Sequence, residues 1–429
     1  MKYLLPRLLM VALLAGAYTP AALAQHHGSG PAYITNEAAT AALSVLPPEP
    51  AVRQTLESMP QLRSSAINID LAKSGKSRLD AGHYEWTVRA ANNRRSDQLG
   101  GSFNEQELSI ERPVRWFGKA GKDAAIGEKG IELASASHAD TWHEASRSLM
   151  ADWFEALREI AATRRLQEQV EIAEQLRTIA EKRVKAGDAA KLELMQADTE
   201  SKRVGALLQQ ARLREEQIVQ MLKNNYPGLP APKADALPTP SALVEPSGFW
   251  LDKIMDDNHE LELAQAEADL FTLQAARIAS DNIPDPTIGL RAGRERNGQE
   301  RIFGISIAIP IPGAARNADK SSAFLKARMA SERFTQTRLK VTANAHRVIT
   351  DSQRSYSIWQ TMQQIRQQSQ AQATTMMSAY KLGEASLSDA LNTRRQALDA
   401  TLAAESAQID ALAGLARLQL DAHLIWAIE

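Results

Sequence analysis

Apolar residues follow two different periods along this chain. Towards the end of the sequence, aliphatic residues are separated by four, seven, four, seven and three positions, which is the spacing of a coiled-coil seam. They are Leu387, Leu391, Leu398, Leu402, Ile409 and Leu412. Four shorter segments alternate apolar and polar residues with the period of two that is typical of strands. They lie at about 83–94, 103–112, 286–294 and 302–311. The pattern predicts a mainly α chain with a long helical coiled coil and four β-strands.

Each predicted strand is about ten residues long, which is the length that crosses a bilayer at a tilt. Asn297-Gly298 between the last two strands is a strong hairpin signal. We expect the apolar positions to face lipid, and because four strands cannot close a pore, several chains must then share one barrel. These positions are Tyr84, Trp86, Val88, Leu108, Ile110, Ile288, Leu290, Phe303, Ile305 and Ile307. The alternative is a soluble hairpin packed on the helices, since half-buried soluble strands alternate too.

Proline and glycine are distributed in a way that indicates two similar halves. Proline is absent from 114–226 and again from 313–429. Gly187 and Gly383 each follow a long stretch without glycine and lie 196 residues apart. The sequences around them are similar, which indicates an internal duplication. We expect two structural repeats separated by a Pro-rich linker. The repeats span 49–222 and 249–429, and the linker spans 223–248.

Each repeat reads as an opening helix, two strands and a hairpin of two very long helices. The opening helices are expected at about 50–80 and 249–281. In the second repeat, 317–382 lacks both proline and glycine, and such a segment would reach roughly 100 Å as one helix. Helices of this length are expected to pack in an elongated bundle or barrel.

The first residues have the three-part layout of a secretory signal. Lys2 and Arg7 are followed by a short apolar run and by Ala22-Leu23-Ala24, a small-x-small cleavage site. We expect a signal peptide over 1–24 and an N-terminal periplasmic segment over 25–48. The alternative, an uncleaved membrane tether, is disfavoured by the cleavage site. The chain has no cysteine, which excludes an acyl anchor on a cysteine.

Charge and composition exclude several classes of function. The 50 basic residues nearly cancel the 51 acidic ones, which argues against a nucleic-acid partner. The sequence has no phosphate loop, nucleophile elbow or compact carboxylate pair, so we expect no enzyme and no cofactor. His26-His27 and Met376-Met377 could contact a soft metal, but a mobile terminus and a packed seam are the commoner explanations. The remaining candidates lack ligand spacing and are His138, His143, His346 and His423.

The sequence around the two glycine turns resembles a known family. Tyr380–Leu391, which contains Gly383 and Asp389, is similar to the TolC family of outer-membrane efflux proteins. Arg183–Leu194 has the same layout in the first half, and the resemblance covers about 50–426. Pro113–Lys119 resembles the strand-to-helix junction of the heavy-metal, or cobalt-zinc-cadmium, efflux branch.

The resemblance implies a homotrimer with a 12-stranded barrel in the outer membrane of a Gram-negative bacterium. The long helices would form a periplasmic tube whose tips, at Gly187, Asp188, Gly383 and Glu384, dock a periplasmic adaptor protein. An inner-membrane RND-type pump would supply energy, and the duct would passively export heavy-metal cations. The alternatives are a duct for drugs or secreted proteins, a periplasmic adaptor, and a structural coiled-coil protein.

The resemblance also implies a gate at the periplasmic entrance. Asp389 matches the first of two aspartates that line the entrance, while the second position is Asn392. Tyr380 matches a tyrosine that bonds across helices, and Glu193 matches its acidic partner. Ala385 replaces the arginine of this lock, so we expect fewer links in the closed state. The alternative for Asp389 is an ordinary acid in the first turn of a helix.

Overall fold

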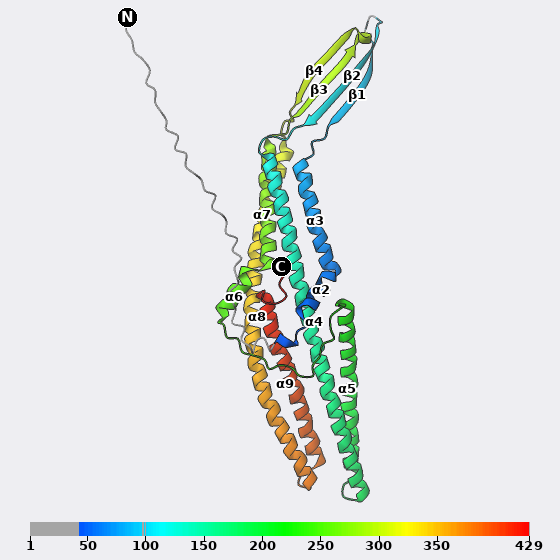
Figure 1. The fold of residues 1–429 in the computed structure, drawn as a ribbon, viewed down its shortest axis with the longest axis vertical. Coiled ribbons are helices and arrows are strands. Elements are labelled where there is room, and N and C mark those ends of the chain that lie inside the picture. Colours follow the sequence, from blue (N-terminus) through cyan, green and yellow to red (C-terminus); the bar gives the residue numbers. More distant parts are fainter. Residues whose placement is uncertain (1–42, 97, 99, 429) are drawn as a thin grey trace, which may run out of the picture. The chain divides into compact units, whose positions relative to one another are not determined.

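The computed structural model describes residues 43–96, 98 and 100–428 (Figure 1). The signal peptide expected over 1–24, most of the segment over 25–48, and His26-His27 lie outside the described residues. The described part is mostly helical and carries one antiparallel sheet of four strands, as the sequence predicts. No described helix combines the length and the apolar character that a membrane span requires.

The helices fall into two similar sets, each with two short members and two long ones. In the first set they are α2 (Glu49–Ser58), α3 (Pro60–Ala81), α4 (Lys119–Ala186) and α5 (Lys191–Asn225). In the second set they are α6 (Ser247–Asp256), α7 (His259–Ala279), α8 (Ala314–Leu382) and α9 (Leu387–Asp421). The described residues also form three short 3-10 turns, namely Leu43–Val45, Ser280–Asn282 and Arg296–Gly298.

Both opening helices are broken in two, where the sequence predicted one continuous helix each. Met59 precedes Pro60 and adopts an extended conformation, because the proline ring disfavours helical geometry at the preceding residue. In the second half, Asn258 caps α7 by accepting a hydrogen bond from the Leu261 amide at 3.0 Å. A proline and an N-cap side chain therefore start a new helix at equivalent places.

The four strands follow one another in the order β1-β2-β3-β4. Their bounds are β1 (Thr87–Ser96), β2 (Ser102–Pro113), β3 (Thr287–Glu295) and β4 (Glu300–Ala308). The central pair β2–β3 joins the two halves, with Ile110 opposite Leu290. The predicted turn at Asn297-Gly298 is confirmed, since both residues have positive φ between β3 and β4.

The first strand starts later than the sequence predicted, at Thr87 instead of residue 83. Tyr84 and Trp86 therefore lie in the connection from α3. The Tyr84 hydroxyl donates to Asp285 Oδ2 at 2.9 Å, and Arg112 lies over the Trp86 ring at 5.3 Å. These side-chain contacts hold the segment out of the strand ladder. The last strand ends at Ala308, just before Pro310, which has no amide hydrogen to donate.

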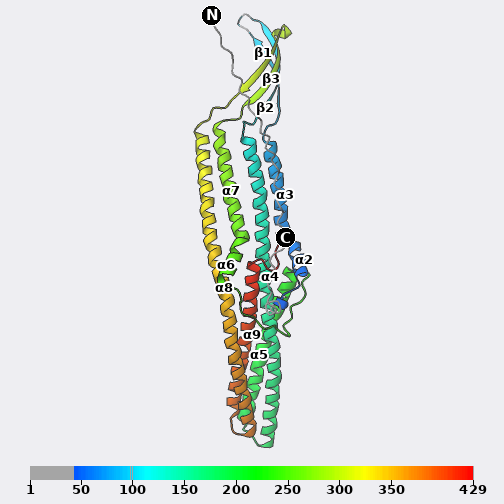
Figure 2. The same ribbon diagram turned by 60° about the vertical axis from the view of Figure 1, so that its left-hand side comes forward.

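The long helices pack in pairs, α4 along α5 and α8 along α9, and α4 also contacts α9 (Figure 2). The shorter α3 and α7 lie along the first parts of α4 and α8. The largest apolar core includes Trp142 and Trp153 of α4, whose indole nitrogens donate to Trp426 O at 2.8 Å and Val45 O at 3.0 Å. The core thus ties the start and the end of the described chain to the middle of α4.

Candidate functional site

One face of the sheet is apolar and remains exposed. The strand register places eight of the predicted lipid-facing residues on this face: Val88, Leu108, Ile110, Ile288, Leu290, Phe303, Ile305 and Ile307. Their exposed fractions run from 37% to 76%. Such exposure shows that the helices of the same chain do not cover the face, so the soluble-hairpin arrangement is not observed. Tyr84 and Trp86 precede β1 and do not belong to the ladder.

The opposite face of the sheet is polar. Arg89 pairs with Glu111 at 2.7 Å, and Arg95 pairs with Glu105 at 3.0 Å, in both cases between β1 and β2. Gly304 of β4 leaves room for the Arg291 side chain, since a Cβ there would lie 3.1 Å from Arg291 Nε. A sheet with one apolar and one polar face is what a membrane barrel requires of its lipid and lumen sides.

Both helical tips end in the same hydrogen-bonded turn. Gly187 and Gly383 have φ of 81° and 83°, a left-handed conformation that glycine adopts without strain. The Asp188 and Glu384 amides each donate back to a carbonyl of the last helical turn at 2.9 Å, as in a Schellman motif. The tips predicted from sequence are therefore exposed turns with matching backbone geometry.

The helices that follow the two tips start differently. Ser386 caps α9, because its Oγ accepts from the Asp389 amide at 3.1 Å. Asp188 has no such role, and α5 begins after Ala190 without a side-chain cap. Only the second of the two tips is therefore followed by a helix with a side-chain cap.

The structure brings Tyr380 and Glu193 together. The Tyr380 hydroxyl donates to Glu193 Oε2 at 3.0 Å and so links α8 to α5. Burial raises the pKa of Tyr380, and the neighbouring Glu193 carboxylate raises it further. Arg183 of α4 lies 5.0 Å above the Tyr380 ring. The sequence did not single out Arg183, which supplies an arginine near this tyrosine although Ala385 occupies the position where the resemblance would place one.

Asp389 and Asn392 are both exposed, and Asp389 is bonded within its own helix turn. Its Oδ2 accepts a hydrogen bond from Ser386 Oγ at 2.7 Å. Met376 and Met377 pack partly buried beside Tyr380 in an apolar cluster at the tips. Within this chain, Asp389 therefore has the geometry of a first-turn acid, and the two methionines have the geometry of packing residues.

Three histidines that are far apart in sequence meet near the end of α9. The ring centroid of His423 lies 4.9 Å from that of His143 and 4.7 Å from that of His259. His143 Nε2 lies 3.2 Å from Asp421 Oδ1, while both ring nitrogens of His423 are buried without a hydrogen-bond partner. Burial lowers the pKa of His143 and, with the adjacent histidines, lowers the pKa of His423 to about 4.

This cluster has no local signal in the sequence, because His143 and Asp421 are 278 positions apart and belong to different repeats. His423 lies beyond the end of α9 and has a positive φ of 56°. Within the described ranges, no group of three or more histidine, aspartate or glutamate side chains is arranged to hold a metal ion.

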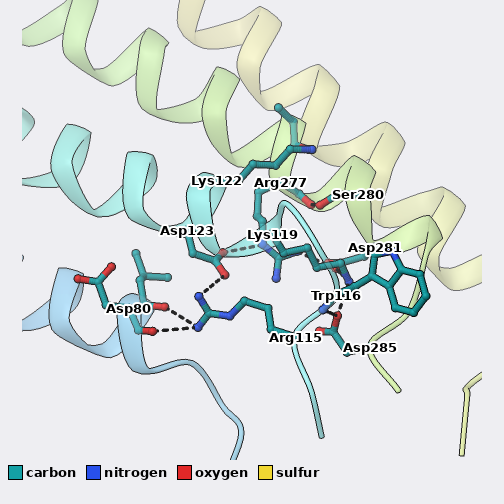
Figure 3. A network of polar contacts seen from close by, with 12 residues as sticks. Asp80, Arg115, Trp116, Lys119, Lys122, Asp123, Arg277, Ser280, Asp281 and Asp285 are labelled. Carbon is teal, nitrogen blue, oxygen red and sulfur yellow. Dashed lines mark hydrogen bonds and ion pairs between the residues drawn. The ribbon is translucent and has the colours of Figure 1, made fainter. Parts of the chain in front are cut away.

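A network of ion pairs fixes the junction between the sheet and the helices (Figure 3). Lys119 is 2% exposed, and its Nζ lies 2.8 Å from Asp281 Oδ1 and 2.9 Å from Asp285 Oδ1. Asp285 also accepts from the Trp116 amide at 2.8 Å. Arg277 pairs with both Asp281 and Asp123, at 2.7 Å and 2.6 Å. The network therefore connects the chain entering β3 to α4 and α7.

Comparison with known proteins identifies the fold as that of outer membrane channels. The chain superimposes on the CmeC outer membrane channel of Campylobacter jejuni with a TM-score of 0.72, at 13% identity, over 87% of this chain and 84% of that one. For the outer membrane protein VceC of Vibrio cholerae the TM-score is 0.70, at 15% identity, over 88% and 95%. For the open state of the Neisseria gonorrhoeae MtrE outer membrane channel it is 0.68, at 14% identity, over 87% and 88%.

No protein-family model matches the sequence, and no curated protein matches it. The similarity therefore lies in the fold, and this fold is the one that the resemblance to TolC-like proteins predicted.

Proposed function

We propose that the protein is the outer-membrane exit duct of a tripartite efflux system. The observation that carries this proposal is the exposed apolar face of the four-stranded sheet. Exposing a contiguous apolar surface to water is unfavourable in free energy, whereas contact of the same surface with the hydrocarbon of a bilayer is favourable. The coiled helices and the shared fold of outer membrane channels support the same conclusion.

The two edge strands support a homotrimer. Within one protomer β1 and β4 each pair on one side only, which leaves a row of backbone donors and acceptors unpaired. A bilayer requires these groups to be bonded, and joining β4 of one copy to β1 of the next satisfies them. Three copies would give twelve strands, with the polar face of each sheet lining the lumen.

The tips and the substrate complete the proposed system. The exposed turns at Gly187–Asp188 and Gly383–Glu384 are suited to docking a periplasmic adaptor, which would connect the duct to an inner-membrane RND-type pump. Heavy-metal cations are the proposed substrate, on the basis of the resemblance at Pro113–Lys119. Deletion should then sensitise cells to zinc, cobalt, cadmium, nickel or copper salts, while sensitivity to organic drugs alone would favour a drug duct.

A pair of adjacent substitutions tests the membrane role of the sheet. Leu108→Lys places a charge on the apolar face, and Glu107→Lys places the same charge on the polar face one residue away. A lysine facing lipid near the bilayer midplane costs about 2–4 kcal/mol, whereas a lumen position tolerates it. We expect Leu108→Lys to abolish trimers in outer-membrane extracts and channel conductance in planar bilayers, and Glu107→Lys to retain both. Equal behaviour of the two variants, or a soluble periplasmic monomer in the natural protein, would overturn the proposal.

A further inference from the structure

A cavity between α4, α8 and α9 is lined by three arginines, one from each helix. Its volume is about 410 Å3, and the arginines are Arg165, Arg366 and Arg394. None of the residues assigned above to the sheet face, the tips or the gate lines this cavity. The cavity is therefore distinct from the sheet face, the tips and the gate residues.

Arg165 is neutralised by acids of its own protomer. Its Nε donates to Glu405 Oε1 at 2.6 Å, and its guanidinium also pairs with Glu168 at 2.8 Å. Glu168 lines the cavity as well, so the positive charge at this corner is compensated.

Arg366 and Arg394 are not compensated in this way. Among the described residues, neither guanidinium has an acidic partner, and Arg366 Nε is buried without a hydrogen bond. Both side chains are half-buried, and burial lowers the pKa of Arg394. An arginine stays charged in proteins, and removing its charge from water is costly unless a counter-charge is present. The two arginines therefore favour an anion in the cavity.

We propose that this cavity binds a small dianionic compound through its carboxylate or phosphate groups, held by Arg366 and Arg394. Guanidinium groups form bidentate hydrogen bonds with such oxygens, and two unpaired cations match two negative charges. Gln370 and Thr401 line the same space, and the Gln370 amide bonds to the Thr401 hydroxyl at 3.2 Å. The volume falls in the range of small-molecule sites.

Calorimetric titration of the purified, detergent-solubilised protein tests this site. Succinate, a dicarboxylate dianion, and inorganic phosphate are titrated separately at constant ionic strength, with chloride as the reference, so that the two arms distinguish carboxylate from phosphate ligands. We expect saturable binding in at least one arm. The Arg366→Gln/Arg394→Gln variant should weaken it at least about tenfold, because each substitution removes charge-assisted hydrogen bonds.

Two further variants control for general charge effects and for folding. Arg328→Gln/Arg338→Gln removes two exposed arginines from α8 and should leave binding unchanged. Arg394→Lys keeps the charge but loses the planar guanidinium that forms bidentate hydrogen bonds, so it should give an intermediate affinity. If the double glutamine variant does not fold, Arg394→Lys replaces it in the test. The proposal fails if neither anion binds saturably, or if the double glutamine variant binds as tightly as the natural protein. If the natural protein binds no anion and the double glutamine variant loses its oligomeric state, an acidic group of a neighbouring copy neutralises the arginines. The proposal also fails in that case. Since the titration measures no transport, its failure leaves the duct proposal intact.

Discussion

At the residue scale, the hydrogen bond between Tyr380 and Glu193 is the clearest candidate for a lock. It joins α8 to α5 at 3.0 Å, next to both helical tips. Tyr380→Phe removes the donor and keeps the packing of the ring, which we expect to destabilise the closed arrangement by about 1 kcal/mol. The open probability of single channels in planar bilayers should rise accordingly.

Glu193→Gln provides the matched control for this lock. The amide oxygen still accepts a hydrogen bond from the tyrosine, so the open probability should rise less than in Tyr380→Phe. A Tyr380→Phe variant with the open probability of the natural protein would exclude this pair from the proposed gate.

The histidine cluster predicts a pH-dependent stability. The pKa of His423 in the folded protein, about 4, lies below the ordinary value near 6.5, so the unfolded chain binds more protons between these values. The contribution of the neutral His423 ring to the free energy of unfolding is thus complete above about pH 6.5. It is lost as the pH falls towards 4, because the unfolded chain then takes up a proton that the folded protein does not. His143, His259, Asp257 and Asp421 face this ring and set its environment.

His423→Asn should flatten this dependence, since asparagine does not titrate and tolerates the positive φ of the position. Thermal unfolding in detergent, followed by circular dichroism from pH 7 to pH 4, measures the effect. The exposed His346→Asn variant should keep the slope of the natural protein. If His423→Asn and the natural protein lose stability equally between pH 7 and pH 4, the assignment to His423 is contradicted.

The Asp421 carboxyl contributes to the pH dependence of stability at lower pH. Burial opposes ionisation of this carboxyl, but the hydrogen bond from His143 and the nearby Arg147 and Arg417 outweigh burial and lower its pKa to about 2.

At the scale of elements, the junction between sheet and helices depends on Lys119. Lys119→Met leaves Asp281 and Asp285 without their shared cation, which we expect to cost about 2 kcal/mol, less than for a fully buried pair because both carboxylates are partly exposed. Hydrogen exchange of the amides entering β3 should accelerate. Lys122→Met is the control, since the half-buried Lys122 donates to the Ala276 carbonyl and has no acidic partner among the described residues. Equal exchange in both variants would show that the network does not hold the junction.

The same elements show what the sequence could reveal. Local patterns in the sequence were enough to predict the long helices, the four strands and the glycine turns. Each of these patterns reflects burial or backbone geometry within a short stretch. The patterns misplaced the start of β1, since the contacts of Tyr84 and Trp86 involve Asp285 and Arg112, which lie elsewhere in the chain. The histidine cluster and the arginine-lined cavity depend on packing between repeats, for which a single sequence carries no local signal.

At the scale of the whole molecule, the role of Asp389 depends on the assembly. In one protomer its carboxylate bonds to Ser386 in the first turn of α9. Three-fold symmetry of the proposed trimer would place three such exposed carboxylates around the axis, where they attract cations. Removing them should weaken block of the pore by divalent cations by about fivefold, given an attraction of about 1 kcal/mol between close charges in water.

Two substitutions separate the pore role of Asp389 from its local role in the helix. Asp389→Asn removes the charge but keeps an oxygen that can accept the Ser386 hydrogen bond, whereas Asp389→Ala removes both. If the charge acts in the pore, the two variants relieve divalent block to the same degree in planar-bilayer recordings. If the residue only stabilises the start of α9, block stays unchanged in both, and only the alanine variant lowers the thermal stability. Because Asn392 lacks a charge one turn further along α9, Asp389 supplies the only carboxylate of these two matched positions, and its loss should be visible without a second substitution.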